Sequence, residues 1–172
     1  MDADNLTGDS HENLMLGGSA DDVLTGKGGA DRLLGGADWD KLYGGFGSDT
    51  ISGGYGYDQM WGGFGKDTFV FTNYKETNSQ NPGDSVDIIM DFGTGFRDDV
   101  IDLSAIDARW DRAGNQAFML IGNLIFSGKS GELQVAQGID TRISGDCNGD
   151  GIADFSIRLS GLHDLTFTHF IF

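Results

Sequence analysis

Carboxylates recur every nine residues through the first part of this chain. They stand at Asp22, Asp31, Asp40, Asp49, Asp58 and Asp67, and Asn13 holds the position one step earlier. Side chains at a strict spacing take equivalent places in stacked turns, so these carboxylates should lie in rows. Stacked carboxylates repel one another unless a cation lies between them. Carboxylate and loop carbonyl oxygens suit Ca²⁺ better than zinc, and the pattern therefore predicts a row of calcium sites.

Seven consecutive nonapeptides over residues 8–70 position these aspartates, and residues 44–52 (GGFGSDTIS) form the most regular copy. Position 8 is apolar in every copy, at Met15, Leu24, Leu33, Leu42, Ile51, Met60 and Phe69. Glycines at positions 1, 2 and 4 permit a tight turn, and the last three residues form a short strand. Two nonapeptides then make one coil of a parallel β-roll, in which position 8 fills the interior. Each loop should therefore face the loop eighteen residues away.

Several copies depart from the pattern. Ala20 and Asp38 replace glycine at position 4, and Lys27 replaces it at position 2. The first copy has His11 at position 4 and Asn13 in place of aspartate. The site that pairs Asn13 with Asp31 is therefore expected to be the weakest one or empty.

Composition agrees with a metal-dependent fold. The chain has 27 acidic and 11 basic residues, for a formal net charge of −16, which argues against nucleic acid or an anionic membrane as a partner. Glycine, which loses the most conformational freedom on folding, supplies 29 of the 172 residues. Without metal we expect the repeat segment to be largely disordered. The chain is expected to act as a monomer that holds about four or five Ca²⁺ ions in the roll.

The nonapeptides resemble the calcium-binding repeats of RTX proteins. DTFVF (67–71), VDIIMDF (86–92), DDVIDLSAID (98–107) and GDCNGDGIADF (145–155) resemble the C-terminal domain of serralysin-type secreted metalloproteases. That resemblance implies a calcium-filled roll followed by a β-sandwich. It also implies a C-terminal signal for a type I exporter, and an upstream catalytic domain.

The family's calcium geometry adds main-chain carbonyl ligands to the aspartates. Positions 2 and 4 of one loop would contribute Gly18, Ala20, Gly29, Gly36, Asp38, Gly45 and Gly47. Positions 1 and 3 of the partner loop would contribute Gly26, Gly28, Gly35, Ala37, Gly44, Phe46, Gly53, Tyr55, Gly62 and Phe64.

The second part of the chain is expected to be a β-rich cap over residues 72–172, after a roll over residues 1–71. A polar loop with the sole proline, Pro82, spans residues 74–84. Short strands are predicted within 86–92 and 98–103, and at 117–121, 123–126, 132–136, 141–144 and 155–159. Residues 104–107 could start one helical turn capped by Ser104, and no segment favours a long helix. We expect the cap to cover Tyr43 and Trp61, because exposed aromatics of that size are unfavourable.

A second kind of calcium loop is possible at residues 146–154. Asp146, Asn148, Asp150, Ile152 and Asp154 offer oxygens at alternate positions around a glycine turn, as in a shortened EF-hand-like loop. The alternative is an acidic hairpin turn that binds no metal. Cys147, at a position that is not a ligand, is expected to point outward, and as the sole cysteine it has no disulfide partner within the chain.

No catalytic motif stands out. His11-Glu12 is not followed by the spacing of a zinc protease, and His163 and His169 are isolated in sequence. We therefore predict a non-catalytic domain of a secreted protein. The acidic first residues predict no signal peptide, and the absence of a long apolar stretch from the sequence predicts no membrane-spanning segment. The alternative is a polysaccharide-binding module, because aromatics occur in the turns, at Trp39, Phe46, Tyr55, Tyr57 and Phe64. Similar roll modules accompany alginate epimerases.

Overall fold

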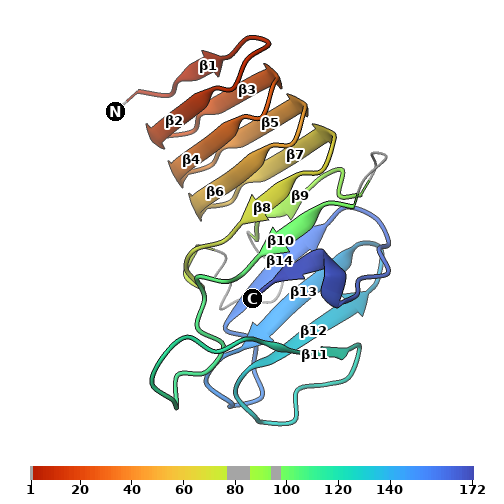
Figure 1. The fold of residues 1–172 in the computed structure, drawn as a ribbon. Helices are drawn as coiled ribbons and strands as arrows, with labels where there is room; N and C mark the ends of the chain where they lie inside the picture. The colour runs from red at the N-terminus through yellow and green to blue at the C-terminus, as the bar shows by residue number, and fades with distance from the viewer. Residues whose placement is uncertain (1, 77–85, 94–97) are drawn as a thin grey trace.

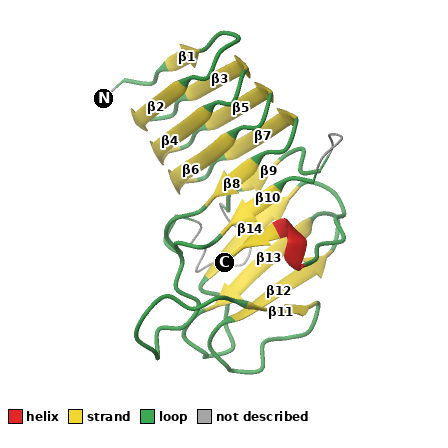
Figure 2. Ribbon diagram, in the orientation of Figure 1, coloured by secondary structure: helices red, strands yellow, loops and turns green. Residues whose placement is uncertain are grey.

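Two β-sheets form the fold in a computed structural model that describes residues 2–76, 86–93 and 98–172 (Figures 1 and 2). The nine-stranded sheet has the order β1-β3-β5-β7-β9-β14-β13-β12-β11, and the six-stranded sheet has the order β15-β10-β8-β6-β4-β2. The strands of the roll are β1 (Asn5–Thr7), β2 (Leu14–Ser19), β3 (Val23–Gly28), β4 (Arg32–Asp38), β5 (Lys41–Phe46), β6 (Thr50–Gly56), β7 (Gln59–Phe64) and β8 (Thr68–Val70). The remaining strands are β9 (Ile88–Ile89), β10 (Val100–Asp102), β11 (Met119–Gly122), β12 (Glu132–Gln137), β13 (Thr141–Asp146), β14 (Phe155–Leu159) and β15 (Phe170–Ile171).

The roll has the predicted register of eighteen residues. Leu24 lies opposite Leu42 in parallel pairing, and Leu33 lies opposite Ile51 in the other sheet. All seven position-8 side chains are buried, and they form one column of the hydrophobic core between the two sheets. The all-β fold and the parallel β-roll are confirmed. The strands run further into the glycine loops than the three residues that we predicted for each.

The C-terminal region extends both sheets of the roll. β9 pairs in parallel with β7 in one sheet, and β10 pairs in parallel with β8 in the other. From β9 the nine-stranded sheet continues through β14, and β12 to β14 form an antiparallel meander. Figure 1 shows the coils stacked toward the N-terminus, with the wider C-terminal sheet beyond β9. The division at residue 71 stays a prediction, because the sheets are continuous there.

Two expectations about the second part were wrong, and one element was not predicted. Residues 123–126 form no strand, because the chain turns after β11 and Gln134 donates a hydrogen bond to the Leu124 carbonyl. Residues 104–107 form a hydrogen-bonded turn and no helix, and Asp102 caps the Ser104 N–H instead. A 3₁₀ helix, η1 (Phe167–His169), was not foreseen. The predicted polar loop around Pro82 lies mostly outside the described residues.

The cap does not cover Tyr43 and Trp61. Both rings are half-exposed and stack on each other, with centroids 4.5 Å apart. The reason is that the C-terminal region joins the roll edge to edge through β9, and so leaves the outer face of the sheet open. Of the described residues, none belongs to a helix long and apolar enough to cross a membrane.

Candidate metal centre

The repeat aspartates form two ladders of side-chain to main-chain hydrogen bonds. In the first ladder the N–H of each residue donates to Oδ1 of the next, in the order Asp4, Asp22, Asp40, Asp58 and Asp87. In the second ladder the order is Asn13, Asp31, Asp49, Asp67 and Asp99. The bonds are 2.7 to 2.9 Å long. The predicted pairs of aspartates eighteen residues apart are therefore neighbours in space.

The second carboxylate oxygen of each repeat aspartate has no hydrogen-bond partner among the described residues. Oδ2 of Asp22, Asp31, Asp40, Asp49, Asp58 and Asp67 is buried and accepts no hydrogen bond from the described residues. An unpaired buried anion is strongly unfavourable, and a row of them is more so. Such oxygens are what a bound cation requires, so the residues fit calcium.

Main-chain carbonyls face the same space as these oxygens. A Cβ built on Gly44 would overlap both Oδ2 of Asp49 and the carbonyl oxygen of Gly62. The same arrangement recurs in three other loops, at Gly17, Gly26 and Gly35, each with its own aspartate and the carbonyl oxygen eighteen residues on. A side chain at position 1 would thus fill the place where a carboxylate and a carbonyl converge.

Two of the predicted carbonyl ligands at position 3, Phe46 and Phe64, already accept hydrogen bonds from the main chain. Gly47 N donates to the Phe64 carbonyl at 2.8 Å, and Gly29 N donates to the Phe46 carbonyl at 2.9 Å. Each of these position-3 carbonyls keeps a second lone pair. Among the described residues, no three His, Cys, Asp or Glu side chains gather closely enough to hold a metal ion. A cation between two loops would therefore draw most of its six to eight ligands from the main chain. The individual ligand assignment stays a prediction.

Burial shifts the pKa of four repeat aspartates in this metal-free arrangement. Burial, together with the charges of neighbouring aspartates, raises the pKa of Asp40 and of Asp67 to about 7. Burial also raises the pKa of Asp49 and of Asp58 to about 6. In each case the hydrogen bond from the preceding loop opposes the rise. In the folded roll without metal, these four carboxyl groups therefore bind protons more readily than free aspartates do.

Asp87 and Asp99 belong to the ladders and were missed from the sequence. Neither of them follows the Gly-Gly-X-Gly pattern of the repeats, so they lie outside the nonapeptide rhythm. The signal that could have found them is an aspartate two residues before an apolar one. Ile89 lies opposite Met60 and Ile101 opposite Phe69, in the register of position 8. Asp91 was also missed, and its two oxygens accept hydrogen bonds from Gly62 N and Gly63 N.

The loop at residues 146–154 is closed by its own carboxylates. Asp146 accepts hydrogen bonds from Gly149 N at 2.6 Å and Gly151 N at 2.9 Å. Asp154 accepts from Cys147 N at 2.7 Å. Burial raises the pKa of the Asp154 carboxyl. Calcium binding by this loop stays a prediction, and the carboxylate oxygens already serve as caps for its main chain.

Cys147 does not point outward as predicted. It is fully buried and belongs to the hydrophobic core, because the Asp154 bond folds the loop back over it. Burial raises the pKa of the Cys147 thiol well above its usual range.

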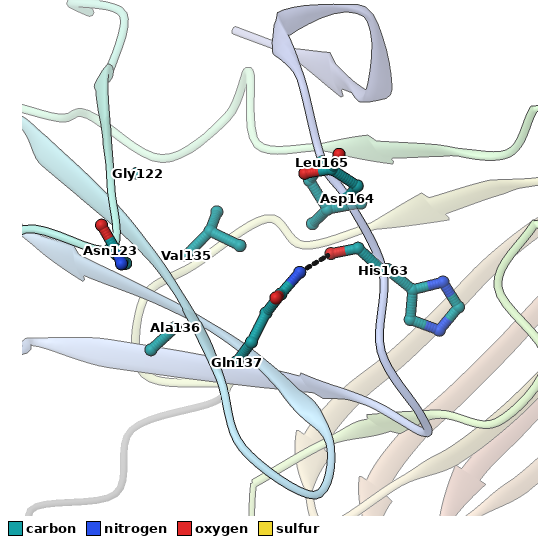
Figure 3. A pocket seen from close by; sticks show the side chains of 8 residues that line it. All are labelled: Gly122, Asn123, Val135, Ala136, Gln137, His163, Asp164 and Leu165. Atoms are coloured by element: carbon teal, nitrogen blue, oxygen red, sulfur yellow. Dashed lines mark hydrogen bonds between the residues drawn. The ribbon is translucent and has the colours of Figure 1, made fainter.

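A polar cleft of about 650 Å³ lies in the C-terminal region (Figure 3). Gln137 donates a hydrogen bond across it to the His163 carbonyl at 2.9 Å. The His163 imidazole points away from Asn123 and Val135 in Figure 3 and contacts the Ser160 carbonyl at 2.9 Å. His169 is likewise engaged, since its Nδ1 accepts a bond from Thr166 N at 3.0 Å. Both histidines therefore have local main-chain partners.

Aromatic side chains of the loops pack in pairs one coil apart. Phe46 stacks on Phe64 with centroids 5.1 Å apart, and Trp39 meets Tyr57 edge to face at 5.7 Å. Trp39, Phe46 and Phe64 each keep more than half of their surface exposed. The rings thus pack over adjacent turns and still present an aromatic edge to solvent.

Comparison with known proteins agrees with this geometry. A family model described as RTX calcium-binding nonapeptide repeat, in four copies, matches residues 16–51 and 43–71. No curated protein sequence matches the chain significantly. The solution structure of the R2 subunit of the Azotobacter vinelandii mannuronan C5-epimerase AlgE6 is similar, with 26% identity and a TM-score of 0.54; the match covers 97% of this chain and 91% of that one. The R3 subunit of the same enzyme is similar in fold, with 24% identity, a TM-score of 0.53, and coverage of 99% and 78%.

Proposed function

Because this chain carries an RTX calcium-binding nonapeptide-repeat domain, we propose that it is a non-catalytic module that folds on calcium after secretion. The observation that carries the proposal is the row of buried Oδ2 atoms without partners along both ladders. We further propose that it belongs to a larger secreted enzyme, as the resemblance to serralysin C-terminal domains implies.

The chain's own residues oppose folding when metal is absent. Carboxylates of one sign are brought together in the ladders, and glycine-rich loops must be ordered at high entropic cost. The interior of the roll is a single column of side chains, so hydrophobic burial offers limited compensation. Bound calcium would supply positive charge between stacked carboxylates and would link neighbouring loops.

The free energy of calcium binding is large enough to determine whether the domain folds. With a dissociation constant of about 0.1 mM, typical of extracellular calcium modules, about 1 mM calcium adds roughly 1.4 kcal/mol per site. Four or five such sites contribute about 6–7 kcal/mol, which is comparable to the stability of a whole domain. The chain would therefore stay unfolded in a calcium-poor cytoplasm and fold outside the cell.

The C-terminal segment is proposed to direct export while the chain is unfolded. In the folded state β15 pairs with β10, and Phe170 is buried. Phe172 packs against Phe118 at a centroid distance of 6.2 Å. A signal that an exporter must read is therefore accessible before these contacts form.

An export assay tests this function. The full chain is produced in cells with and without a type I exporter, beside a variant that lacks residues 165–172. We expect the full chain to reach the medium only with the exporter, and the shortened chain to remain inside. Equal export of both chains, or retention of both, would contradict the proposal.

Polysaccharide binding is a second candidate, favoured by the exposed ring pairs. Tyr43 and Trp61 are half-buried and stack on each other in the nine-stranded sheet, and the similar AlgE6 subunit comes from a mannuronan C5-epimerase. Rings with one open face are suited to stacking on sugars. The net charge of −16 opposes an acidic polymer.

Calorimetric titration with neutral and acidic oligosaccharides, at constant calcium, distinguishes this candidate. Saturable binding that Trp61→Ala weakens and Trp110→Ala preserves would support it. The absence of saturable binding would remove it.

A further inference from the structure

A short edge strand and a single turn hold the C-terminal segment on the rest of the molecule. β15 has two residues and lies at the end of the six-stranded sheet, beside β10. Leu103 N donates to the Ile171 carbonyl at 2.9 Å, and Phe170 is buried. A two-residue edge strand opens more readily than the interior of a sheet, so the η1 turn before it matters for its retention.

Two reciprocal hydrogen bonds between Thr166 and His169 close the η1 turn. His169 N donates to the Thr166 carbonyl at 3.0 Å, as is usual for a 3₁₀ turn. In return Thr166 N donates to Nδ1 of His169, also at 3.0 Å. The Thr166 hydroxyl lies 3.2 Å from the same nitrogen. The imidazole therefore provides an acceptor for a main-chain N–H at the start of the turn.

This geometry determines the protonation state of the His169 ring. A main-chain N–H can only donate, so Nδ1 must hold a lone pair, and the proton of the neutral ring is on Nε2. An imidazolium carries a proton on both nitrogens and accepts no hydrogen bond. Protonation of His169 would direct its Nδ1–H and the Thr166 N–H at each other. The closed turn therefore requires a neutral imidazole.

His163, in the same segment, tolerates a proton. Its Nε2 lies 2.9 Å from the Ser160 carbonyl, which can only accept, so Nε2 carries a proton in the neutral ring. Protonation of Nδ1 preserves that bond, because the bond uses only Nε2. A positive charge thus disrupts the contacts of His169 and is compatible with those of His163.

Phe92 connects both histidines to the roll. Its ring is 2% exposed, and it meets the His163 ring edge to face at 5.8 Å and the His169 ring at 6.1 Å. Phe92 also contacts Phe69, the last position-8 residue of the repeats, with centroids 6.2 Å apart. The His169 turn is therefore linked to the last coil through one aromatic ring.

Acidic groups occur on the elements that pack against the His169 turn. They are Asp164 and the terminal carboxylate of Phe172 in its own segment, Asp99 and Asp102 around β10, and Asp91 beside Phe92. None of the ion pairs found among the described residues involves His169. The surrounding negative charge attracts a proton to the ring, and the hydrogen bond from Thr166 N opposes its uptake.

We propose that His169 is a proton-controlled latch for the C-terminal segment. With a neutral ring the η1 turn is closed and β15 lies on β10. When the ring takes up a proton, Thr166 N loses its acceptor, the turn opens, and residues 165–172 leave the sheet edge more often. Histidine is suited to this role because its ring ordinarily titrates between about pH 5 and 8.

The latch makes the buried end of the folded, calcium-loaded domain accessible again in acidic surroundings. Its meaning for export rests on the proposed function, because residues 165–172 are an export signal only under that proposal. The opening itself depends only on the contacts of His169, and the two can be tested separately.

Hydrogen exchange of the full chain at saturating calcium, at about pH 7.5 and about pH 5.5, tests the latch. After correction for the intrinsic pH dependence of exchange, the protection of Thr166 N–H and of Leu103 N–H should fall about tenfold on acidification. Thr50 N–H, which donates to the Asp31 carbonyl within the roll, should keep its protection. Equal protection of Leu103 N–H at both pH values would overturn the latch.

Two histidine variants assign the pH response to one ring. His169→Asn places Oδ1 where Nδ1 lies, an acceptor that does not titrate, so Leu103 N–H should stay protected at both pH values. His163→Gln is the matched control, because it removes the other titrating ring and keeps an N–H donor for the Ser160 carbonyl. It should retain the pH response of the unchanged chain. An unaltered response in His169→Asn, or its loss in His163→Gln, would overturn the proposal.

A second measurement decides the matter if His169→Asn does not fold. The nitrogen NMR spectrum of the unchanged chain at about pH 7.5 shows which ring nitrogen of His169 carries the proton. A bare Nδ1 supports the latch, and a protonated Nδ1 overturns it. If the latch fails while the full chain is exported, the proposed function stands. If the segment opens with acid but export does not depend on it, the latch stands and the proposed function fails.

Discussion

Asp40 N donates a hydrogen bond to Oδ1 of Asp58, eighteen residues further along the chain, at 2.9 Å. Asp31 and Asp49 are joined in the same way at 2.8 Å. One oxygen of each aspartate therefore fixes the adjacent loop, while the other is buried and has no hydrogen-bond partner in the described part of the chain. Replacement by asparagine separates the two roles, because it keeps an acceptor and removes the charge.

Asp49→Asn should weaken calcium-dependent folding more than Asp67→Asn. Asp49 lies between two neighbours in its ladder, Asp31 and Asp67, and so would contribute to two repeat sites. Asp67 is followed by Asp99, whose oxygens both cap N–H groups. The expected losses at about 1 mM calcium are about 3 kcal/mol and about half of that. Calcium titration followed by circular dichroism gives the midpoints, and equal midpoints would contradict stacked sites.

Ala20→Gly should stabilise the calcium-loaded domain by about 1 kcal/mol. Ala20 has a φ of +84°, in the left-handed region that a Cβ disfavours. Ala30→Gly is the matched control, because Ala30 itself does not have a positive φ and glycine there should destabilise by about 0.4–1 kcal/mol. Urea unfolding at fixed calcium measures both. A loss of stability in Ala20→Gly would refute the assignment of strain.

Gly47→Ala should prevent folding of the roll, whereas Gly18→Ala should cost only about 1–2 kcal/mol. Both glycines have positive φ, at +132° and +106°. A Cβ on Gly47 would overlap the Gly29 carbonyl of the adjacent loop, whereas a Cβ on Gly18 meets nothing within 4 Å. Thermal unfolding with calcium separates the two effects, and similar melting temperatures for the two variants would be inconsistent with close loop stacking.

Acidification should stabilise the metal-free domain. Burial raises the pKa of Asp40 and of Asp67 from 3.8 to about 7, so the folded chain binds protons that the unfolded chain releases. This stabilisation is complete below the unfolded value and is lost as pH rises through the folded value. In chelator, circular dichroism should show more structure at about pH 5 than at about pH 7.5. The affinity for calcium should fall on acidification, because protons compete for the same carboxylate oxygens.

The repeat period is the part of the structure that the sequence predicts best. A strict spacing of nine with an apolar residue two positions after each aspartate determines the coil and the register of Leu24 with Leu42. The same spacing predicts that aspartates two nonapeptides apart, such as Asp22 and Asp40, are neighbours in space. Local spacing was sufficient because each coil repeats the contacts of the previous one.

Contacts outside the repeats depended on tertiary packing. Asp87 reaches its ladder across 29 residues, and no periodic signal of that length exists. Cys147 is buried because Asp154 folds the loop back over it, an effect that alternation along a strand does not reveal. Tyr43 and Trp61 stayed half-exposed because the cap extends a sheet edge, and a hydrophobic pattern does not distinguish edge pairing from face packing.

Circular dichroism and thermal melting of the full chain, with calcium and after chelation at neutral pH, test the central claim most directly. If cations between the carboxylates hold the two ladders together, the chelated chain should lose most of its β-signal and its cooperative transition. Calcium should restore both, whereas an equal concentration of magnesium should not. Identical spectra and melting curves with and without calcium would contradict the account.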